Sequence, residues 1–412
     1  MITMPTPADL LTQLEAAVHA GDRALAQDLA RQIQQALVRE SYDQAAVERR
    51  MRESLAELDQ AAPVVQLTMV DILDTERFIK VASPAEGTVY PVWFGTNRKP
   101  DGQGGFGTER HASTTRGRAE VLIPQGHRFG ETGSPFWKKL RRLDLRDDTI
   151  RLQQLTPQAH ADWLADIQQA MQDVEAGGET PHALFFLHGF NVTFEEAAIR
   201  AAQIGFDLKV PGATAFFSWP SRGSVTAYPA DEASIEASER AITDFLVDFA
   251  AHCGAKKVHV IAHSMGNRGL LRALQRIAAN AQTQGQVKFG QVFLAAPDVD
   301  RDLFMDLASL YPAHSERTTL YASQADLPVH LSAELHDAPR AGYFRPYTVA
   351  PGVDTVAVPD FDIDLLGHSY FAQAEALLHD IYSLMRLDAA PDKRQRIRPA
   401  VEGGVSFWEF SE

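Results

Sequence analysis

The sequence contains a single cysteine, Cys253, among its 412 residues. An intramolecular disulfide is therefore excluded, and so are a cysteine-rich zinc site and a disulfide-stabilised secreted scaffold. Long apolar runs are also missing, because segments 183–187 and 258–262 extend for only five residues, against the ~20 that a membrane-spanning helix needs. The first residues lack the basic and apolar regions of a secretory signal. These absences predict a cytoplasmic protein with no integral membrane association.

Positive charge is scarce as well. The chain has 39 Lys and Arg against 54 Asp and Glu, which gives a formal net charge of -15. A molecule of that charge repels phosphate backbones and anionic lipid surfaces, so nucleic acid is not expected as a partner. Hydrophobic residues make up 45% and charged residues 23%, which is typical of a globular protein and excludes a wholly disordered or coiled-coil chain.

Residues 1–62 differ from the rest of the chain. Leu, Ile and Val recur there at helical spacing, and Gly21-Asp22 interrupts the pattern where a turn and an N-cap would sit. We therefore predict a helical hairpin, followed by a third helix that ends before Pro63. This segment is expected to pack on the main domain or on a second subunit, so it is where homo-oligomerisation or a protein partner would act.

Residues 84–386 are predicted to form one α/β domain, in which short apolar runs alternate with amphipathic patterns. Strands are predicted at 88–94, 119–123, 150–155, 183–187, 213–217, 257–261, 291–294, 318–322 and 354–357. Helices are predicted at 159–175, 194–209, 231–251, 267–283 and 370–386. This alternation is typical of a mostly parallel central sheet with helices on both faces. The first strands have no clear helix between them, so an antiparallel edge is expected.

Two segments lack such periodicity. Residues 97–118 are rich in Gly, Thr and Arg and are predicted to be a long surface loop. Residues 387–412 are predicted to be a linker and C-terminal tail, in which Lys393-Arg394-Gln395-Arg396 is interpreted as a solvated stretch. The alternating end of that tail, 405–410, predicts a short docked strand.

The strongest local signal is a strand-to-helix junction. In Val258-His-Val-Ile-Ala-His-Ser-Met-Gly-Asn-Arg-Gly, an apolar strand runs into the small-residue pattern Ala262-His-Ser-Met-Gly266 and then into a helix. A nucleophile elbow needs small residues two before and two after its serine, because the turn is too tight for larger side chains. Ser264 is therefore the candidate nucleophile, with a strained backbone and an exposed hydroxyl.

Acyl transfer needs two preorganised N–H donors for the oxyanion of the tetrahedral intermediate. Met265, which follows the serine, is expected to supply one. The second is expected from the loop after the strand Ala183-Leu-Phe-Phe-Leu-His-Gly-Phe-Asn, where Phe190 is preferred and Asn191 is the alternative. His188 is interpreted as a structural histidine that orders this loop by hydrogen bonding.

A serine needs a histidine to take its proton and a carboxylate to orient that histidine. The expected chain order of serine, acid and histidine is met by Ser264, Asp326 and His368, of which the last two follow predicted strands. No HExxH, CxxC or Asp-rich calcium loop is present, so neither a metal nor another cofactor is expected. The weaker candidates are Asp298, Asp300 and the acids of 354–364 for the acid, and His314 and His330 for the base; His263 is interpreted as a packing residue.

Several ordered motifs carry a resemblance that spans about residues 88–385. They are Val92-Trp-Phe-Gly-Thr-Asn-Arg98, His188-Gly-Phe-Asn191, Phe217-Ser-Trp-Pro220, Ala262-His-Ser-Met-Gly-Asn267, Leu294-Ala-Ala-Pro-Asp298, Leu320-Tyr-Ala-Ser-Gln-Ala-Asp326 and Gly367-His-Ser-Tyr370. Together they resemble a bacterial family of alpha/beta hydrolases of unknown function, related to lipases and esterases. The resemblance implies an alpha/beta-hydrolase fold for the catalytic domain at 84–386. It also implies Ser264, Asp326 and His368 as the triad.

The leading hypothesis is a serine hydrolase that cleaves a small-molecule carboxylic ester. Trp219, Tyr228 and Phe190 are expected to form an apolar wall for an acyl or aromatic group, and Asn191 is a further candidate for substrate binding. An amidase, a peptidase or a thioesterase would use the same triad. A hypothesis of another class is a partner-binding or signalling protein, in which residues 1–62 recruit the partner and the hydrolase domain is an effector.

Overall fold

The computed structural model describes residues 87–125, 127, 149–223, 227–285, 287–323, 338–343, 347–358 and 371–410. These residues fall within one compact unit of the chain. The helices predicted within 1–62 lie outside the described residues, and so do Asp326 and His368. None of the helices in the described ranges combines the length and the apolar character that crossing a bilayer requires.

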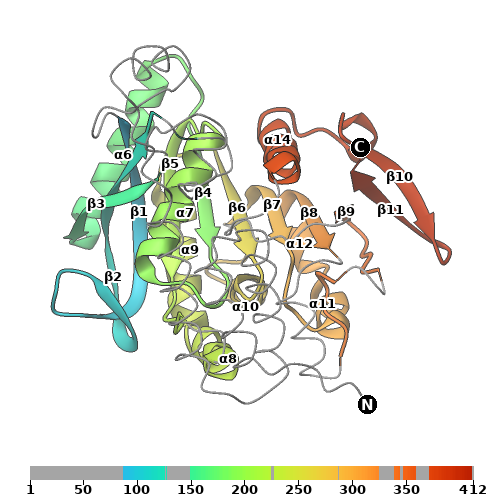
Figure 1. Cartoon of the computed structure of the whole chain (residues 1–412), viewed down its shortest axis with the longest axis horizontal. Helices are drawn as coiled ribbons and strands as arrows, with labels where there is room; N and C mark the ends of the chain where they lie inside the picture. The colour runs from blue at the N-terminus through green and yellow to red at the C-terminus, as the bar shows by residue number, and fades with distance from the viewer. Residues whose placement is uncertain are drawn as a thin grey trace, which may run out of the picture. The chain divides into compact units, whose positions relative to one another are not determined.

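One mixed sheet organises this unit (Figure 1). Its eleven strands in the described ranges have the order β10-β11-β9-β8-β7-β6-β4-β5-β1-β2-β3. In chain order they are β1 Gly87–Pro100, β2 Phe106–Pro124, β3 Arg151–Gln158, β4 His182–Leu187, β5 Gly212–Ser218, β6 Lys257–His263, β7 Phe289–Ala295, β8 Ser315–Ser323, β9 Val353–Val358, β10 Ile397–Glu402 and β11 Val405–Phe410. Neighbours from β11 to β1 pair in parallel, whereas β1–β2, β2–β3 and β10–β11 are antiparallel. The predicted mostly parallel sheet with an antiparallel edge is confirmed.

Both faces of the sheet are buried, because successive side chains of a strand point to opposite faces. In β4, Phe185 and Leu187 join the core under one set of helices, and Leu184 and Phe186 join the core on the other face. The first face is covered by α6 (His160–Ala176), α8 (Tyr228–Ala237), α9 (Glu239–His252), α10 (Gly266–Ala279), α11 (Arg301–Leu307) and α12 (Leu310–His314), and the second by α7 (Phe194–Asp207) and α14 (Phe371–Leu387). Strands buried on both sides explain the continuous apolar runs of the sequence.

Most helices lie where the amphipathic patterns predict them. The single helix predicted at 231–251 is divided into α8 and α9 at Ser238, whose Oγ donates to the carbonyl of Ser234 (2.7 Å). The short helices α11 and α12 were not predicted, since so few residues show no clear period.

The predicted loop at 97–118 is wrong, because β1 and β2 continue through it as a long hairpin. Asp101 makes the connecting turn: its Oδ1 accepts hydrogen bonds from the N–H groups of Gln103 (2.7 Å) and Gly105 (2.9 Å). The outward half of β2 is exposed and polar. It therefore lacks the alternation of apolar and polar residues that marks a half-buried strand.

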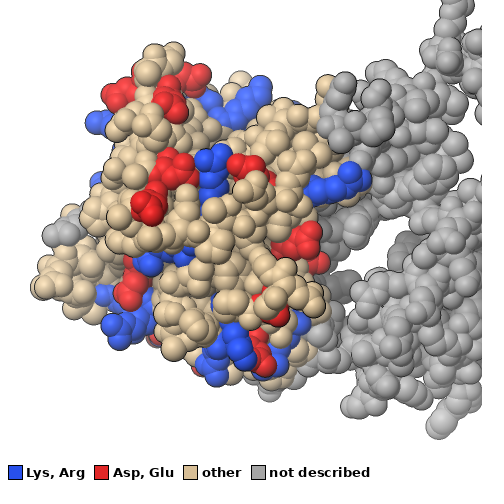
Figure 2. Space-filling view, turned by 90° about the vertical axis from the view of Figure 1, so that its left-hand side faces the viewer, with Lys and Arg blue, Asp and Glu red and all other residues tan. Residues whose placement is uncertain are grey.

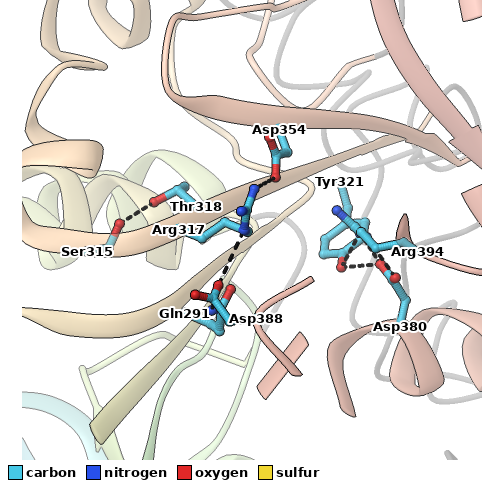
Figure 3. Close-up of polar contacts among 9 residues, drawn as sticks. All are labelled: Gln291, Ser315, Arg317, Thr318, Tyr321, Asp354, Asp380, Asp388 and Arg394. Carbon is cyan, nitrogen blue, oxygen red and sulfur yellow. Dashed lines mark hydrogen bonds and ion pairs between the residues drawn. The ribbon is translucent and has the colours of Figure 1, made fainter. Parts of the chain in front are cut away.

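In the predicted solvated stretch Lys393-Arg394-Gln395-Arg396, Lys393, Gln395 and Arg396 are exposed, and the prediction is wrong for Arg394. Arg394 is buried, and its guanidinium donates two hydrogen bonds to the carboxylate of Asp380 in α14. The hydroxyl of Tyr321 in β8 donates to the same carboxylate (2.7 Å). Figure 3 shows the three side chains converging from different elements. The strand predicted at 405–410 is present as β11, which pairs in parallel with β9, so residues 394–410 belong to the folded unit.

A second group of contacts in Figure 3 fixes the end of α14 against the sheet. Arg317 of β8 contacts Asp354 of β9 (2.9 Å) and Asp388 (3.4 Å), and Gln291 of β7 donates to Asp388 (2.7 Å).

On the side that carries β1–β3 and α6, Figure 2 shows acidic and basic side chains interspersed. Arg118 lies there within 3.2 Å of Asp166.

Candidate active site

Ser264 occupies the tight turn between β6 and α10. Its φ of 48° lies in the left-handed region, which residues other than glycine rarely adopt. The N–H of Ser264 donates to the carbonyl of Ala295 at the end of β7 (2.9 Å). The side-chain amide of Asn267 donates to the carbonyls of Ser264 (3.0 Å) and Ala262 (3.1 Å). Hydrogen bonds on both sides of the serine thus hold the strained turn that the sequence predicts.

Two glycines let the loop after β4 lie directly against this turn. A Cβ on Gly266 would come within 2.6 Å of the carbonyl oxygen of His188, and a Cβ on Gly189 would lie 3.0 Å from the Cβ of Ser264. Only glycine permits the first approach. This packing leaves Ser264 4% exposed, so the hydroxyl is covered rather than exposed as expected. Its Oγ has no hydrogen-bond partner among the described residues.

In the loop of residues 188–192, some backbone N–H groups have a hydrogen-bond acceptor and others have none in the described ranges. The N–H of Asn191 donates to Asp231 Oδ2 (3.2 Å), and the N–H of Val192 donates to Ser221 Oγ (3.1 Å). Within the described ranges, the N–H groups of Gly189 and Phe190 have no acceptor, and neither has that of Met265. An oxyanion hole needs N–H groups that the protein leaves unbonded. This arrangement favours Phe190 over Asn191 as the second donor, and the assignment stays a prediction.

His188 and Trp219 pack together beneath this loop. The Nε1 of Trp219 donates to the carbonyl of His188 (2.9 Å), and the two rings stack with centroids 5.1 Å apart. Burial, followed by the charge of Arg98, lowers the pKa of His188 to about 3, so its imidazole is neutral at physiological pH. Trp219 is 0% exposed. In this structure its indole is therefore a packing group of the interior and not part of an open wall.

Phe190 and Tyr228 are the two predicted wall residues that the structure brings together. Their rings meet edge to face with centroids 5.4 Å apart. The hydroxyl of Tyr228 donates to the carboxylate of Asp298, and it accepts from Arg268 Nη2 (2.8 Å). Tyr228 thereby links the loop of residues 188–192 to the segment that follows β7.

Asp298, the alternative triad acid, belongs to a buried ion cluster. Its N–H donates to the carbonyl of Ser264 (3.2 Å). Its carboxylate lies 3.3 Å from Arg268 Nη2 and 3.5 Å from Arg340 Nε, in addition to its bond from Tyr228. A buried carboxylate between two guanidinium groups is typical of a structural ion pair. This setting favours Asp326 over Asp298 as the acid.

The other two triad candidates can be placed only by the elements that flank them. Asp326 comes three residues after β8, which ends at Ser323, and His368 lies between β9, which ends at Val358, and α14. Strands β6, β8 and β9 are parallel members of one sheet. Their carboxyl ends therefore meet at one edge, where ligands bind in sheets of this type.

Sequence reasoning missed two buried charges beside the site. Asp231 accepts hydrogen bonds from Asn191 N–H, Ser221 Oγ (2.6 Å) and the N–H of Arg222 (2.8 Å). Arg98 is 0% exposed and donates to residues around the same loop. The available signal was the position of Arg98 at the end of the first resemblance motif, Val92 to Arg98. Cys253 is no rival nucleophile, because burial raises the pKa of its thiol to about 11.

Solved structures similar to this chain include esterases and an uncharacterised protein, at low similarity. An uncharacterised protein from Bacillus cereus is 12% identical, with a TM-score of 0.34, and the match covers 51% of this chain and 61% of that one. An esterase from Pyrobaculum calidifontis is 11% identical, with a TM-score of 0.31 and coverage of 76% and 88%. A fungal esterase from Rhizomucor miehei is 13% identical, with a TM-score of 0.34 and coverage of 80% and 94%. No curated protein matches the sequence.

The family comparison is more specific. The profile of a family described as "Alpha/beta hydrolase of unknown function (DUF900)" matches residues 165–386, which is more than half of the chain. The match includes the elbow at Ser264 and the loop of residues 188–192, and it extends from α6 to the end of α14. With the parallel sheet and the strained serine described above, this chain belongs to that family of alpha/beta hydrolases.

Proposed function

We propose that this hydrolase cleaves a carboxylic ester through Ser264, Asp326 and His368, by way of an acyl-enzyme. The observation that carries the proposal is the setting of Ser264. It has a left-handed backbone at a strand-to-helix turn, and its Oγ has no partner among the described residues. A strained serine with an uncommitted hydroxyl is what nucleophilic attack requires.

The proposed reaction has two steps. His368 takes the proton of Ser264 Oγ as that oxygen attacks the ester carbonyl, and Asp326 holds the imidazole in the required tautomer. The oxyanion that forms accepts hydrogen bonds from the N–H groups of Met265 and Phe190. His368 then gives the proton to the leaving alcohol, and it later activates the water that hydrolyses the acyl-enzyme.

The two N–H groups support this assignment by their location. Met265 follows the nucleophile directly, and Gly189, next to Phe190, is in close contact with Ser264. Both N–H groups lack acceptors in the described part of the chain. The rings of Phe190 and Tyr228 adjoin the same loop, so an acyl or aromatic group of the substrate is proposed to bind against them.

Hydrolysis of short p-nitrophenyl esters tests the proposal. Ser264→Ala should abolish turnover, whereas Ser309→Ala, which alters an exposed serine, should leave it unchanged. Circular dichroism and thermal unfolding of both variants would show that the fold is kept. Undiminished turnover by Ser264→Ala would refute the assignment. Matched ester, amide and thioester substrates would separate an esterase from an amidase, a peptidase or a thioesterase.

A further inference from the structure

A chain of buried hydrogen bonds runs from the edge hairpin to the loop of residues 188–192. The Nε of Arg98 in β1 donates to Ser218 Oγ (2.8 Å). Ser218 Oγ in turn lies 3.3 Å from His188 Nε2, and His188 Nδ1 lies 2.7 Å from the carbonyl oxygen of Gly189. Arg98, Ser218 and His188 are each 0% exposed, so water does not compete for these bonds.

The direction of each bond follows from the groups at the two ends of the chain. A guanidinium N–H can only donate, so Ser218 Oγ accepts from Arg98. A carbonyl oxygen can only accept, so His188 Nδ1 carries the proton and donates it to Gly189. A neutral imidazole then has no proton on Nε2, which accepts from the hydroxyl of Ser218.

The carbonyl of Gly189 and the N–H of Phe190 belong to the same peptide group. A peptide group is planar, and in the trans form its C=O and N–H point in opposite directions. A hydrogen bond that fixes the carbonyl of Gly189 therefore also fixes the direction of the N–H of Phe190. The carbonyl is held by His188 in the interior, which leaves the N–H directed away from that ring.

Arg98 also holds the far end of the loop. Its Nη2 donates to the carbonyl of Val192 (2.7 Å), and its Nη1 donates to the carbonyl of Ser221 (3.0 Å). The Oγ of Ser221 accepts from the N–H of Val192 (3.1 Å) and donates to Asp231. One guanidinium thus bonds both to the end of the loop, at Val192, and to the segment after β5, at Ser221. A lysine, with a single ammonium group, could not make these divergent hydrogen bonds.

On this geometry we propose that Arg98 is a positioning residue for the oxyanion hole. Through Ser218 it sets the Nδ1–H tautomer of His188, and His188 aims the N–H of Phe190 at the oxyanion. The proposal rests on the proposed function, because it assigns a purpose to the direction of that N–H. Arg98 lies in β1 of the edge hairpin, outside the matched range of 165–386.

The tautomer can be measured without turnover. Long-range proton–nitrogen correlation spectra of protein labelled with 15N-histidine should show one ring with the Nδ1–H pattern that does not change from pH 8 to pH 5. Loss of that signal in His188→Asn assigns it. In Ser218→Ala the same ring should lose its pure Nδ1–H pattern. An Nε2–H pattern for His188 in the wild type would overturn the proposal.

Kinetics give the second readout. Removing one oxyanion donor costs ~10²–10³-fold in kcat, so Ser218→Ala and Arg98→Lys should lower kcat by ~10²-fold, with KM within ~2-fold of the wild type. His188→Asn retains a side-chain N–H near the Nδ1 position and should recover most of kcat, whereas His188→Leu should not. The matched control is Tyr90→Phe, which removes a part-buried hydrogen bond to Thr214 (2.9 Å) in the same sheet. That variant should retain wild-type kcat.

The outcomes are distinguishable. A Ser218→Ala enzyme that keeps its fold and its full kcat overturns the positioning role, even if esters are hydrolysed as proposed. A wild type that hydrolyses no ester refutes the proposed function. If its His188 ring still shows the Nδ1–H pattern, and loses that pattern in Ser218→Ala, the chain of hydrogen bonds from Arg98 through Ser218 to His188 is supported. An equal loss of kcat in Tyr90→Phe and Ser218→Ala also overturns the proposal, since the loss of any side-chain hydrogen bond within the sheet would then have the same effect.

Discussion

Arg394→Met should lower the free energy of unfolding by about 3–5 kcal/mol, the usual cost of leaving one member of a buried ion pair without its partner. The side chains of Arg394 and Asp380 are only 1% and 3% exposed. After the substitution, the carboxylate of Asp380 would keep the hydroxyl of Tyr321 and lose both guanidinium bonds. Methionine has a similar length and is apolar, so lost packing contributes little to the expected effect.

Urea unfolding followed by tryptophan fluorescence measures this change through the midpoint at constant slope. Lys393→Ala is the matched control, because this neighbouring side chain is 75% exposed and its ion pair within the described residues is with the exposed Asp392. Its effect should stay within about 0.5 kcal/mol. Adding Asp380→Leu to Arg394→Met should recover most of the loss, since no buried charge would remain. An Arg394→Met protein as stable as Lys393→Ala would refute the view that the C-terminal segment is part of the folded unit.

Two further predictions concern pH and packing. Burial lowers the pKa of His188 and of His259 to about 3, against about 6.5 in an unfolded chain. The unfolded state therefore binds more protons between these pH values, and the free energy of unfolding should fall as the pH drops from about 6.5 toward 3. A free energy of unfolding that stays constant over that window, measured by urea unfolding, would contradict this prediction. Gly266→Ala should destabilise the protein by about 1–3 kcal/mol and lower kcat, because the added Cβ would meet two backbone oxygens at 2.6 and 2.7 Å. Gly107→Ala, whose Cβ would meet nothing closer than 3.7 Å, is the control, and equal effects of the two changes would refute the packing argument.

The parallel core of the sheet could be predicted because its strands are buried on both faces. β4, for example, is apolar from Ala183 to Leu187, and the elbow at Ser264 is encoded locally by small residues on either side of the serine. Those signals need no knowledge of distant contacts. They are therefore sufficient for the fold class and for the position of the candidate nucleophile.

Features that depend on distant partners could not be predicted in this way. From the sequence, Arg394 is interpreted as a solvated charge, because its partners Asp380 and Tyr321 belong to other elements. From the sequence, Arg98 is interpreted as a loop residue, because its hydrogen-bond acceptors in Ser218 and Val192 are about a hundred positions away. A buried charge is recognisable only when its partner is known.

Labelling with a fluorophosphonate, followed by peptide mass spectrometry, tests the central claim most directly. The probe reacts with an activated serine and leaves a stable adduct at the attacking oxygen. The account predicts one modified residue, Ser264, in the wild-type protein, the same adduct in Ser309→Ala, and none in Ser264→Ala. A wild-type protein that stays unlabelled at Ser264, or that is labelled at another residue while esters are hydrolysed, would contradict it.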